Sequence, residues 1–547
     1  MKKDEISSAL KEAGTLLELS EENYFKVKAY YDAARIISGI ENLDEIIKEK
    51  KLNKIKGIGP SISEFIESIY FKGTHPLLED LRGKFSPEFL ELLKLPGMGI
   101  KKMLLLQKEL NITSIQDLNY AIYENRLLNI KGFGKKTQEK LKESLNYYET
   151  IKGKLLLNEA IKIESKILSN YPNLYPAGAL RRRLPIIEKL EFVLKDIKLE
   201  KICEILKIEE MKIEKDFINF KLENHNVIIY EGGANFFKTL FEKTGSEKHL
   251  AQIKNFKEIP DDINSEEEIY RKINLDFIPP EMREGIGEVE LAKENLISKV
   301  VDIKDIKGLL HNHTIESDGA SQIKDYVKVA ESEGFSFVGI ADHSKSAKYA
   351  GGLEEERLLR QIKEINSLNK DKNFIVFSGV ECDILSNGEL DYGDEILEKL
   401  DYVVVSIHSH FNFIKEEQTK RILNAISKKS AKILGHPEGR ILLGRKGYEI
   451  DMDAILERLG KQKKWIELNA NPLRLDLDWQ YIKKAQDFQV PISISPDAHN
   501  AEDLKDVFYG VLMARKGLLF KENCINTWEN EKLKEEFNFY EKRRKNI

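Results

Sequence analysis

The amino-acid sequence predicts a multidomain α/β protein with three differently built regions. Residues 1–150 carry helical periodicity, interrupted by a glycine motif that occurs three times. Residues 151–295 mix strand-like and helical runs, and residues 300–547 alternate apolar runs with amphipathic stretches. This alternation predicts βα units and a parallel sheet, closed into a barrel, at the carboxy-terminal end. A chain of 547 residues is long enough for several such domains.

The composition is typical of a globular chain without a global affinity for nucleic acid. Charged residues make up 33% and hydrophobic residues 41%, and the net charge is −5, so any surface that binds DNA must be local. The three cysteines form no CxxC pair, which favours a reducing cytoplasm over a disulfide framework. The start MKKDEISSALKEAG lacks the apolar core of a signal peptide, and no run is long enough to span a bilayer. We expect a cytoplasmic protein that does not contact membranes.

The amino-terminal region repeats one pattern, x-G-x-G followed by a helix. The copies are KIKGIGPSISEFI, KLPGMGIKKMLLL and NIKGFGKKTQEKL. Paired glycines let a turn approach a partner closely, and the next helix offers free backbone N–H groups to a phosphate. Turns that only pack helices together are the alternative, but three copies with basic neighbours favour nonspecific binding to the DNA backbone. The candidate DNA-binding residues are Gly57, Gly59, Gly97, Gly99, Lys101, Lys102, Gly132, Gly134, Lys135 and Lys136.

The carboxy-terminal region concentrates histidines. Seven of the ten lie between residues 311 and 499, mostly where an apolar run ends. The candidate metal ligands are His311, His313, Asp318, His343, Glu381, His408, His436, Asp497 and His499. Mixed histidine and carboxylate ligands suit manganese, zinc or iron better than calcium, and clustered cations activate water for phosphodiester hydrolysis. Core or capping polar residues are the alternative, which nine such positions disfavour.

The runs HxHTxxSDG, ADHS, GxExDI, SIHSH, GHPxGR and SxDAH resemble the motifs of the polymerase and histidinol phosphatase (PHP) domain family over most of residues 305–520. The resemblance implies a distorted (β/α)7 barrel with three divalent cations, manganese being favoured over zinc or iron. It implies one cation on His311, His313, Glu381 and Asp497, a second on Glu381, His408 and His436, and a third on Asp318, His343 and His499. The first of these sets is also the predicted catalytic set.

Four further polar residues follow the predicted strand ends. Arg440, Asn471 and Arg474 are candidates for holding substrate phosphates, with surface salt bridging as the alternative, and Arg440 is assigned to DNA binding. His410, two positions after His408, either contacts a phosphate or is a polar surface residue, and we favour the second interpretation.

The order of the segments resembles bacterial family X DNA polymerases over the whole chain. YFKVKAYYDAARII is similar to that family's amino-terminal helical domain, AGALRRR to its nucleotide-binding segment and KTGSEKHLAQI to its thumb-proximal segment. The resemblance places the three polymerase carboxylates at Lys189, Glu191 and Ile228, and Ala179 replaces a phosphate-contacting serine. A lysine and an isoleucine cannot hold Mg²⁺. A shifted register would rescue one carboxylate, Glu188, but not the third.

The family's lyase lysine falls on Phe65, so lyase activity is doubtful. We expect these domains: 1–85, a helical DNA-binding domain with the first helix-hairpin-helix; 86–150, a fingers-like helix-hairpin-helix region; 151–285, a degenerate palm and thumb; 286–304, a linker; and 305–547, the PHP domain.

The predicted function is metal-dependent 3′–5′ exonuclease action and 3′-end processing in DNA repair, by a nucleoid-associated monomer at 3′ ends or gaps. Three alternatives stay open: an active family X polymerase with PHP proofreading, a small-molecule phosphomonoesterase of the histidinol phosphatase type, and a non-enzymatic DNA-binding scaffold.

Overall fold

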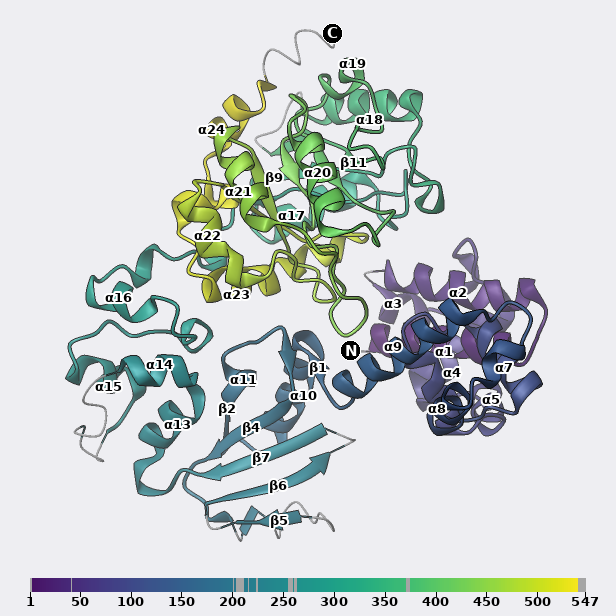
Figure 1. Cartoon of the computed structure of the whole chain (residues 1–547), viewed down its shortest axis with the longest axis horizontal. Helices are drawn as coiled ribbons and strands as arrows, with labels where there is room; N and C mark the ends of the chain where they lie inside the picture. The colour runs from purple at the N-terminus through teal and green to yellow at the C-terminus, as the bar shows by residue number, and fades with distance from the viewer. Residues whose placement is uncertain are drawn as a thin grey trace. The chain divides into compact units, whose positions relative to one another are not determined.

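The computed structural model describes residues 2–40, 42–199, 201–202, 211–214, 216–222, 225–253, 259, 263–369 and 374–539 (Figure 1). The chain forms two compact units, Met1–Lys152 and Gly153–Ile547. The finer domain boundaries stay predictions. Cys382 and Cys524 are buried free thiols, while Cys203 lies outside the described residues. Among the described helices, none combines the length and the apolar character required to cross a bilayer.

The first unit is helical throughout its described residues, as the periodicity predicts. Its helices are α1 (Lys2–Leu19), α2 (Tyr24–Ser38), α3 (Leu43–Lys48), η1 (Leu52–Lys54), α4 (Pro60–Lys72), α5 (Pro76–Gly83), α6 (Pro87–Glu91), η2 (Leu92–Lys94), α7 (Ile100–Leu110), α8 (Ile115–Tyr123), η3 (Arg126–Asn129) and α9 (Lys135–Ile151). Ile6, Leu10, Ala13 and Leu17 are buried at helical spacing on one face of α1. Each of η1, η2 and η3 leads into one of the three glycine motifs.

The second unit begins with a mixed sheet in the order β2-β4-β7-β6-β5 and the small pair β1-β3. The strands are β1 (Leu155–Leu156), β2 (Leu174–Ala177), β3 (Ile186–Ile187), β4 (Lys189–Leu194), β5 (Met211–Ile213), β6 (Phe217–Leu222) and β7 (His225–Glu231). The helices of this part are α10 (Leu157–Asn170), α11 (Gly178–Arg181), η4 (Gly233–Asn235), α13 (Phe236–Thr244), α14 (Glu247–Gln252), α15 (Glu266–Lys272), η6 (Pro280–Met282), α16 (Glu288–Lys293), η7 (Ile297–Lys299) and η8 (Ile303–Asp305). Apolar side chains of α10 pack with those of β4, β6 and β7 in one core.

The rest of the unit contains two parallel sheets, β10-β9-β8 and β11-β12-β13-β14-β15. The strands are β8 (Gly308–Leu309), β9 (Phe337–Ile340), β10 (Ile375–Ser378), β11 (Glu381–Asp383), β12 (Val404–Ser406), β13 (Ile433–Leu434), β14 (Trp465–Asn469) and β15 (Ile492–Ser495). The helices are α17 (Ile323–Ser332), η9 (Lys348–Ala350), α18 (Glu355–Leu368), α19 (Asp394–Leu397), α20 (Lys415–Ile426), α21 (Met452–Lys461), η10 (Trp479–Tyr481), α22 (Ile482–Asp487), η11 (Ala501–Asp506), α23 (Val507–Lys516), η12 (Lys521–Asn523), η13 (Ile525–Thr527) and α24 (Asn530–Glu536).

Two isolated parallel bridges join these two sheets. Asn312, after β8, pairs with Ala498, after β15, and His343, after β9, pairs with Glu381 of β11. Both bridges include or adjoin predicted metal ligands. The pairing favours the predicted closure of the strands into a barrel, which stays a prediction.

Candidate metal centre

The predicted ligands stand at the carboxyl ends of the parallel strands. His311 follows β8, His343 follows β9, His408 follows β12 and His436 follows β13, while Glu381 opens β11. Parallel strands bring these ends to the same edge of their sheet. His311 and His436, together with Asp497 after β15, adopt positive φ angles of 62°, 23° and 51°. Such backbone strain, costing on the order of 1–3 kcal/mol per residue, is concentrated at functional sites.

One group of ligand atoms comes from His311, His313 and Asp497, whose side-chain atoms lie within 4.8 Å of one another. His313 Nε2 lies 3.0 Å from Asp497 Oδ1, and His311 Nε2 lies 3.7 Å from the same oxygen. Glu381 borders this group, since its Oε1 is 3.4 Å from His311 Nε2. The arrangement agrees with the first predicted cation set.

Glu381 lies at the centre of the cluster and contacts the remaining histidines of the second set. Its Oε1 is 2.8 Å from His436 Nε2 and 3.2 Å from His408 Nε2, and its Oε2 is 2.9 Å from His343 Nδ1. The group of ligand atoms that could hold a second cation consists of His343, Glu381 and His408, so it contains His343 where the resemblance implies His436. The bridging role that the resemblance implies for Glu381 stays a prediction.

A third group joins Asp318, His343 and His499, together with His313. Asp318 Oδ2 lies 3.6 Å from His343 Nε2, and Asp318 Oδ1 lies 3.4 Å from His499 Nε2. Asp318 and His499 are only partly buried, whereas His313 is fully buried. This third group therefore faces the solvent side of the cluster.

The donor set fits metal ions because several of its buried atoms make no hydrogen bond, although most of them lie close to an oppositely charged group of the cluster. Five buried side-chain atoms of the cluster lack a hydrogen-bond partner: His311 Nε2, His313 Nδ1, His343 Nδ1, His436 Nδ1 and Glu381 Oε2. Buried polar atoms are ordinarily paired, and leaving one unpaired costs roughly 1–3 kcal/mol. A divalent cation is the partner that nitrogen and carboxylate oxygen atoms at these distances would share.

The pKa values of the cluster are shifted because its carboxylates and its histidines stabilise each other's charged forms. Burial would raise the pKa of Glu381, but His408, His311 and His343 hold it well below its usual value. Burial lowers the pKa of His343, and Glu381 and Asp318 outweigh this and raise it to about 10. The positive charge of His343 and the negative charges of Glu381 and Asp318 therefore stabilise each other. Metal binding would release the extra proton of His343, because metal ligands must be deprotonated.

Two carboxylates behind the ligands were not found from the sequence. Glu467 of β14 is fully buried, with Oε1 2.6 Å from His311 Nδ1, and its Oε2 accepts the His436 backbone N–H at 2.6 Å. Asp383 Oδ1 lies 2.8 Å from His408 Nδ1. A carboxylate on one ring nitrogen fixes the tautomer and directs the other nitrogen to the metal. An acidic residue inside the apolar run WIELN was the available signal for Glu467.

The two arginines predicted to hold a substrate phosphate differ in how many contacts with the protein they already make. Arg474 is near the cluster, with Nε 3.6 Å from Asp497 Oδ2. Arg440 is committed to protein contacts, since its guanidinium donates to Asp478 and to the backbone oxygens of Arg474 and Leu475. It therefore orders the loop that carries Arg474, and its assignment to DNA binding stays a prediction.

The other two phosphate candidates make local contacts. The side-chain oxygen of Asn471 accepts the Leu473 N–H. His410 is exposed, with its ring 5.3 Å from that of Phe413. For His410 this agrees with the favoured interpretation as a surface residue.

The three glycine motifs share one local geometry. Gly57, Gly97 and Gly132 have φ angles of 96°, 78° and 94°, which favour glycine, and Gly59, Gly99 and Gly134 cap α4, α7 and α9. A Cβ atom on Gly99 or Gly134 would meet nothing within 4 Å, and neither residue needs a positive φ. Neither packing nor conformation requires glycine there, so a close external partner would explain it. Lys101, Lys131, Lys135 and Lys136 are exposed beside these turns, and Lys102 donates to Gly97 O at 2.8 Å.

Comparison with known proteins agrees with both sets of motifs. A PHP domain model matches residues 310–471, a helix-hairpin-helix domain model matches residues 1–75, and a SAM-like helix-hairpin-helix tandem model matches residues 89–146. The DNA polymerase/3′–5′ exonuclease PolX of Bacillus subtilis (strain 168) is 33% identical over 561 residues, which cover 96% of this chain and 97% of that protein. The chain belongs to the PolX family.

Other relatives of this PolX chain match parts of it. A probable phosphatase of Thermoanaerobacter sp. (strain X514) is 30% identical over 205 residues, which cover 36% of this chain and 79% of that protein. A probable phosphatase of Clostridium acetobutylicum is 30% identical over 174 residues, covering 30% of this chain and 64% of that protein.

The polymerase positions of this PolX chain lie side by side in its mixed sheet. Strands β4 and β7 are parallel neighbours, and their register sets Glu191 directly beside Ile228. The Tyr230 hydroxyl donates to Glu191 Oε1 at 2.9 Å, and Ile228 is buried. Glu188, the alternative carboxylate, pairs with Lys154. The positions expected to converge do converge, with one carboxylate among them.

The arginines of the AGALRRR segment bind the protein's own carboxylates. Arg181 pairs with Glu266, Arg182 with Glu284 and Arg183 with Glu164. In the first unit, the lyase position Phe65 is fully buried, with its ring 5.3 Å from that of Tyr30 and 4.9 Å from that of His75. Phe65 is therefore a core residue.

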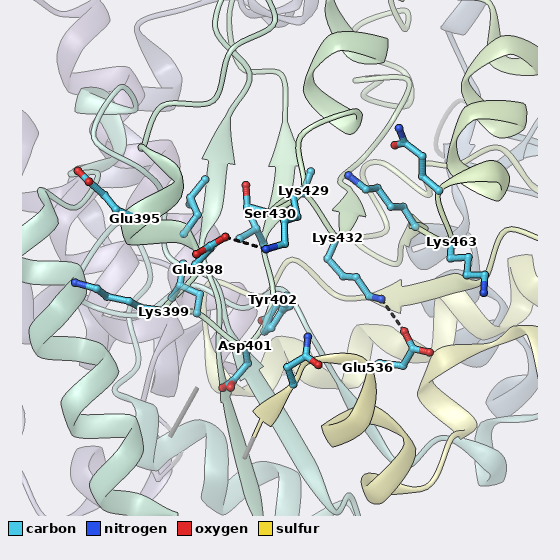
Figure 2. A pocket seen from close by; sticks show the side chains of 17 residues that line it. Glu395, Glu398, Lys399, Asp401, Tyr402, Lys429, Ser430, Lys432, Lys463 and Glu536 are labelled. Atoms are coloured by element: carbon cyan, nitrogen blue, oxygen red, sulfur yellow. Dashed lines mark hydrogen bonds and ion pairs between the residues drawn. The ribbon is translucent and has the colours of Figure 1, made fainter. Parts of the chain in front are cut away.

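Two cavities lie away from the metal ligands. One of about 820 Å³ borders Gly178, Glu191, Ser246, Trp479 and Lys483. The other, of about 520 Å³, lies where β12, β13 and β14 begin, whereas His408 and His436 follow the ends of β12 and β13 (Figure 2). Its lysines pair locally: Lys429 with Glu398 at 3.1 Å and Lys432 with Glu536 at 2.7 Å. None of the nine predicted metal ligands lines either cavity.

Proposed function

We propose that this PolX chain is a metal-dependent phosphodiesterase that removes nucleotides from the 3′ ends of DNA. The observation that carries the proposal is the set of five buried ligand atoms around Glu381 that make no hydrogen bond. We further propose that the nine ligands hold three divalent cations, with manganese favoured. Such cations supply an activated water and neutralise phosphate oxygens when bound.

The side chains of the chain itself have defined tasks in this proposal. Glu467 and Asp383 orient His311 and His408 through their Nδ1 atoms, which leaves the Nε2 atoms toward Glu381. Arg474, partly exposed beside Asp497, is placed to hold a nonbridging oxygen of the substrate phosphate. Arg440 donates to the backbone oxygens of residues 474 and 475, and these contacts keep Arg474 in position.

The hairpins support DNA as the substrate. Open space at Gly99 and Gly134, with exposed lysines nearby, suits close approach of a phosphate backbone without base readout. The Bacillus subtilis relative is named a DNA polymerase and 3′–5′ exonuclease. We infer a role in repair at 3′ ends or gaps, and hence a location with the nucleoid.

We also propose that the polymerase site has lost its activity. Glu191 is the one carboxylate at the three expected positions, and a two-metal mechanism needs more oxygen ligands than it provides. Its carboxylate lies against Gly178 of the AGALRRR segment, where it would repel a triphosphate. The three arginines of that segment already hold carboxylates of the protein.

A labelled-oligonucleotide assay with the full-length protein tests the nuclease. With Mn²⁺, a 5′-labelled single strand should shorten stepwise from its 3′ end, and a chelator should stop the reaction. His343→Ala should abolish shortening, whereas His225→Ala, a histidine distant from the cluster in sequence and outside its ligand groups, should not. Shortening that His343→Ala leaves intact would mean that the assigned site is wrong.

Two further assays address the competing functions. Primer extension with dNTPs and Mg²⁺ or Mn²⁺ should give no templated addition, and addition at ordinary polymerase rates would overturn the proposed loss. Because relatives of the PHP part are named probable phosphatases, turnover of histidinol phosphate should also be measured. Faster turnover of that monoester than of DNA would favour the small-molecule phosphomonoesterase.

A further inference from the structure

A large aromatic side chain is exposed on a loop that is otherwise anchored. Tyr349, in η9 between β9 and α18, has 74% of its surface exposed, while Ala347 and Ala350 on either side are buried. Ser346 donates to Asp391 through its backbone N–H at 2.6 Å and through its hydroxyl at 2.5 Å. Arg357 donates to Gly351 O at 3.0 Å. The loop is held on both sides of a ring that is itself left in solvent.

The ring stands at the edge of the metal centre. Its centroid is 6.3 Å from that of His343. An exposed aromatic face thus adjoins the position where a phosphodiester would be cleaved.

The chemistry of a nucleic-acid end explains this placement. Exposed aromatic rings bind unpaired nucleobases by stacking, whichever base is present. A base in a duplex is already stacked and paired, so it must be unpaired before such a ring can reach it. Small phosphomonoesters without a planar base would gain nothing from the ring.

We propose that Tyr349 is a specificity-determining residue whose ring stacks on the unpaired 3′-terminal nucleobase of a DNA strand. This inference rests on the proposed exonuclease function. It predicts that the site prefers single-stranded 3′ ends, and it assigns this preference to one residue at the rim of the site, outside the ligand set.

The test compares two single-stranded oligonucleotides that differ only in their last unit, a normal nucleotide or a tetrahydrofuran residue without a base. Tyr349→Ala should lower kcat/KM for release of the normal terminal unit by about tenfold, the size expected from loss of one stacked base. It should leave release of the baseless unit unchanged. Tyr349→Phe should keep the wild-type preference, since it retains the ring. Phe508→Ala, which removes another exposed aromatic of this unit, should act like wild type.

The outcomes separate the two proposals. Suppose that the wild-type protein releases both units and that Tyr349→Ala slows both releases equally. This result would overturn the stacking role of Tyr349, while the proposed exonuclease function would remain supported. A Tyr349→Phe protein as slow as Tyr349→Ala would overturn the stacking role in the same way. If wild-type protein with Mn²⁺ releases neither unit, the exonuclease function fails, and the inference fails with it.

Discussion

The metal centre and the polymerase site are two clusters of charged residues at strand positions, and they differ in whether the protein hydrogen-bonds their buried polar atoms. At the metal centre, five buried ligand atoms make no hydrogen bond. At the polymerase site, Glu191 accepts the Tyr230 hydroxyl, and each arginine of AGALRRR holds a carboxylate. One site is incomplete without a ligand, and the other is complete without one.

The difference teaches how an active site and its remnant can be told apart by physics. Partnerless buried polar atoms are costly, so they persist where a ligand completes them. A remnant loses that ligand, and its surviving charges pair internally as Glu191 does. The same side chains then hold the fold together. The contacts of Lys516 illustrate this, since it is fully buried and donates to Glu284 and to the backbone oxygen of Arg182.

The largest predicted effect comes from the same substitution made in both regions. Glu381→Gln removes the bridging carboxylate, and we expect exonuclease kcat/KM to fall by roughly a thousandfold or more, about 4 kcal/mol of transition-state stabilisation. Glu191→Gln should change it by less than about twofold, because this residue would hold no cation. Exonuclease rates and bound manganese measured for both variants check the prediction. Equal losses would break the comparison.

The next predicted effect concerns the structural role of the segment around the inactive polymerase site, which contacts Lys516 through Arg182 and Glu284. Lys516→Met leaves Glu284 as a buried charge with one ionic partner fewer, and we expect the free energy of unfolding to fall by about 3–5 kcal/mol. Lys429→Met removes the exposed pair with Glu398 and should cost less than about 1 kcal/mol. Urea denaturation of the full chain measures both. A Lys516→Met protein as stable as Lys429→Met would show that the palm segment is not required to stabilise the PHP part.

A smaller effect should follow from a carboxylate that does not touch the metal. Glu467→Gln keeps the shape of the side chain but removes its negative charge, which weakens its hydrogen bond with His311 Nδ1. We expect manganese affinity to fall by about 10–100-fold. Activity should then recover at high Mn²⁺ concentration, with kcat close to wild type. A lower kcat that added Mn²⁺ does not restore would assign Glu467 a role beyond orienting the ligand.

Most of the predicted ligands follow an apolar run, where strand geometry leaves little freedom, and the structure brings them into one cluster, while their binding of metal stays a prediction. It also identified Lys189, Glu191 and Ile228 as matching positions, and the register of β4 and β7 sets two of them side by side. Glu467 and Asp383 escaped notice because their roles depend on contacts with histidines far along the chain. Tyr349 escaped for a related reason: exposure beside a metal centre is a property of the folded loop.

The smallest predicted effect concerns the third glycine motif, where there is open space around Gly134. Gly134→Ala adds a methyl group into open space at a permissive φ, so the free energy of unfolding should change by less than about 0.5 kcal/mol. If a phosphate approaches this turn, the methyl group should weaken DNA binding several-fold, which fluorescence anisotropy with a labelled duplex would measure. Gly83→Ala, also in open space but at the end of α5, is the matched control and should bind as wild type. Unchanged affinity in Gly134→Ala would mean that the third hairpin is a packing turn. Open space would then indicate a ligand only where, as around Glu381, partnerless polar atoms accompany it.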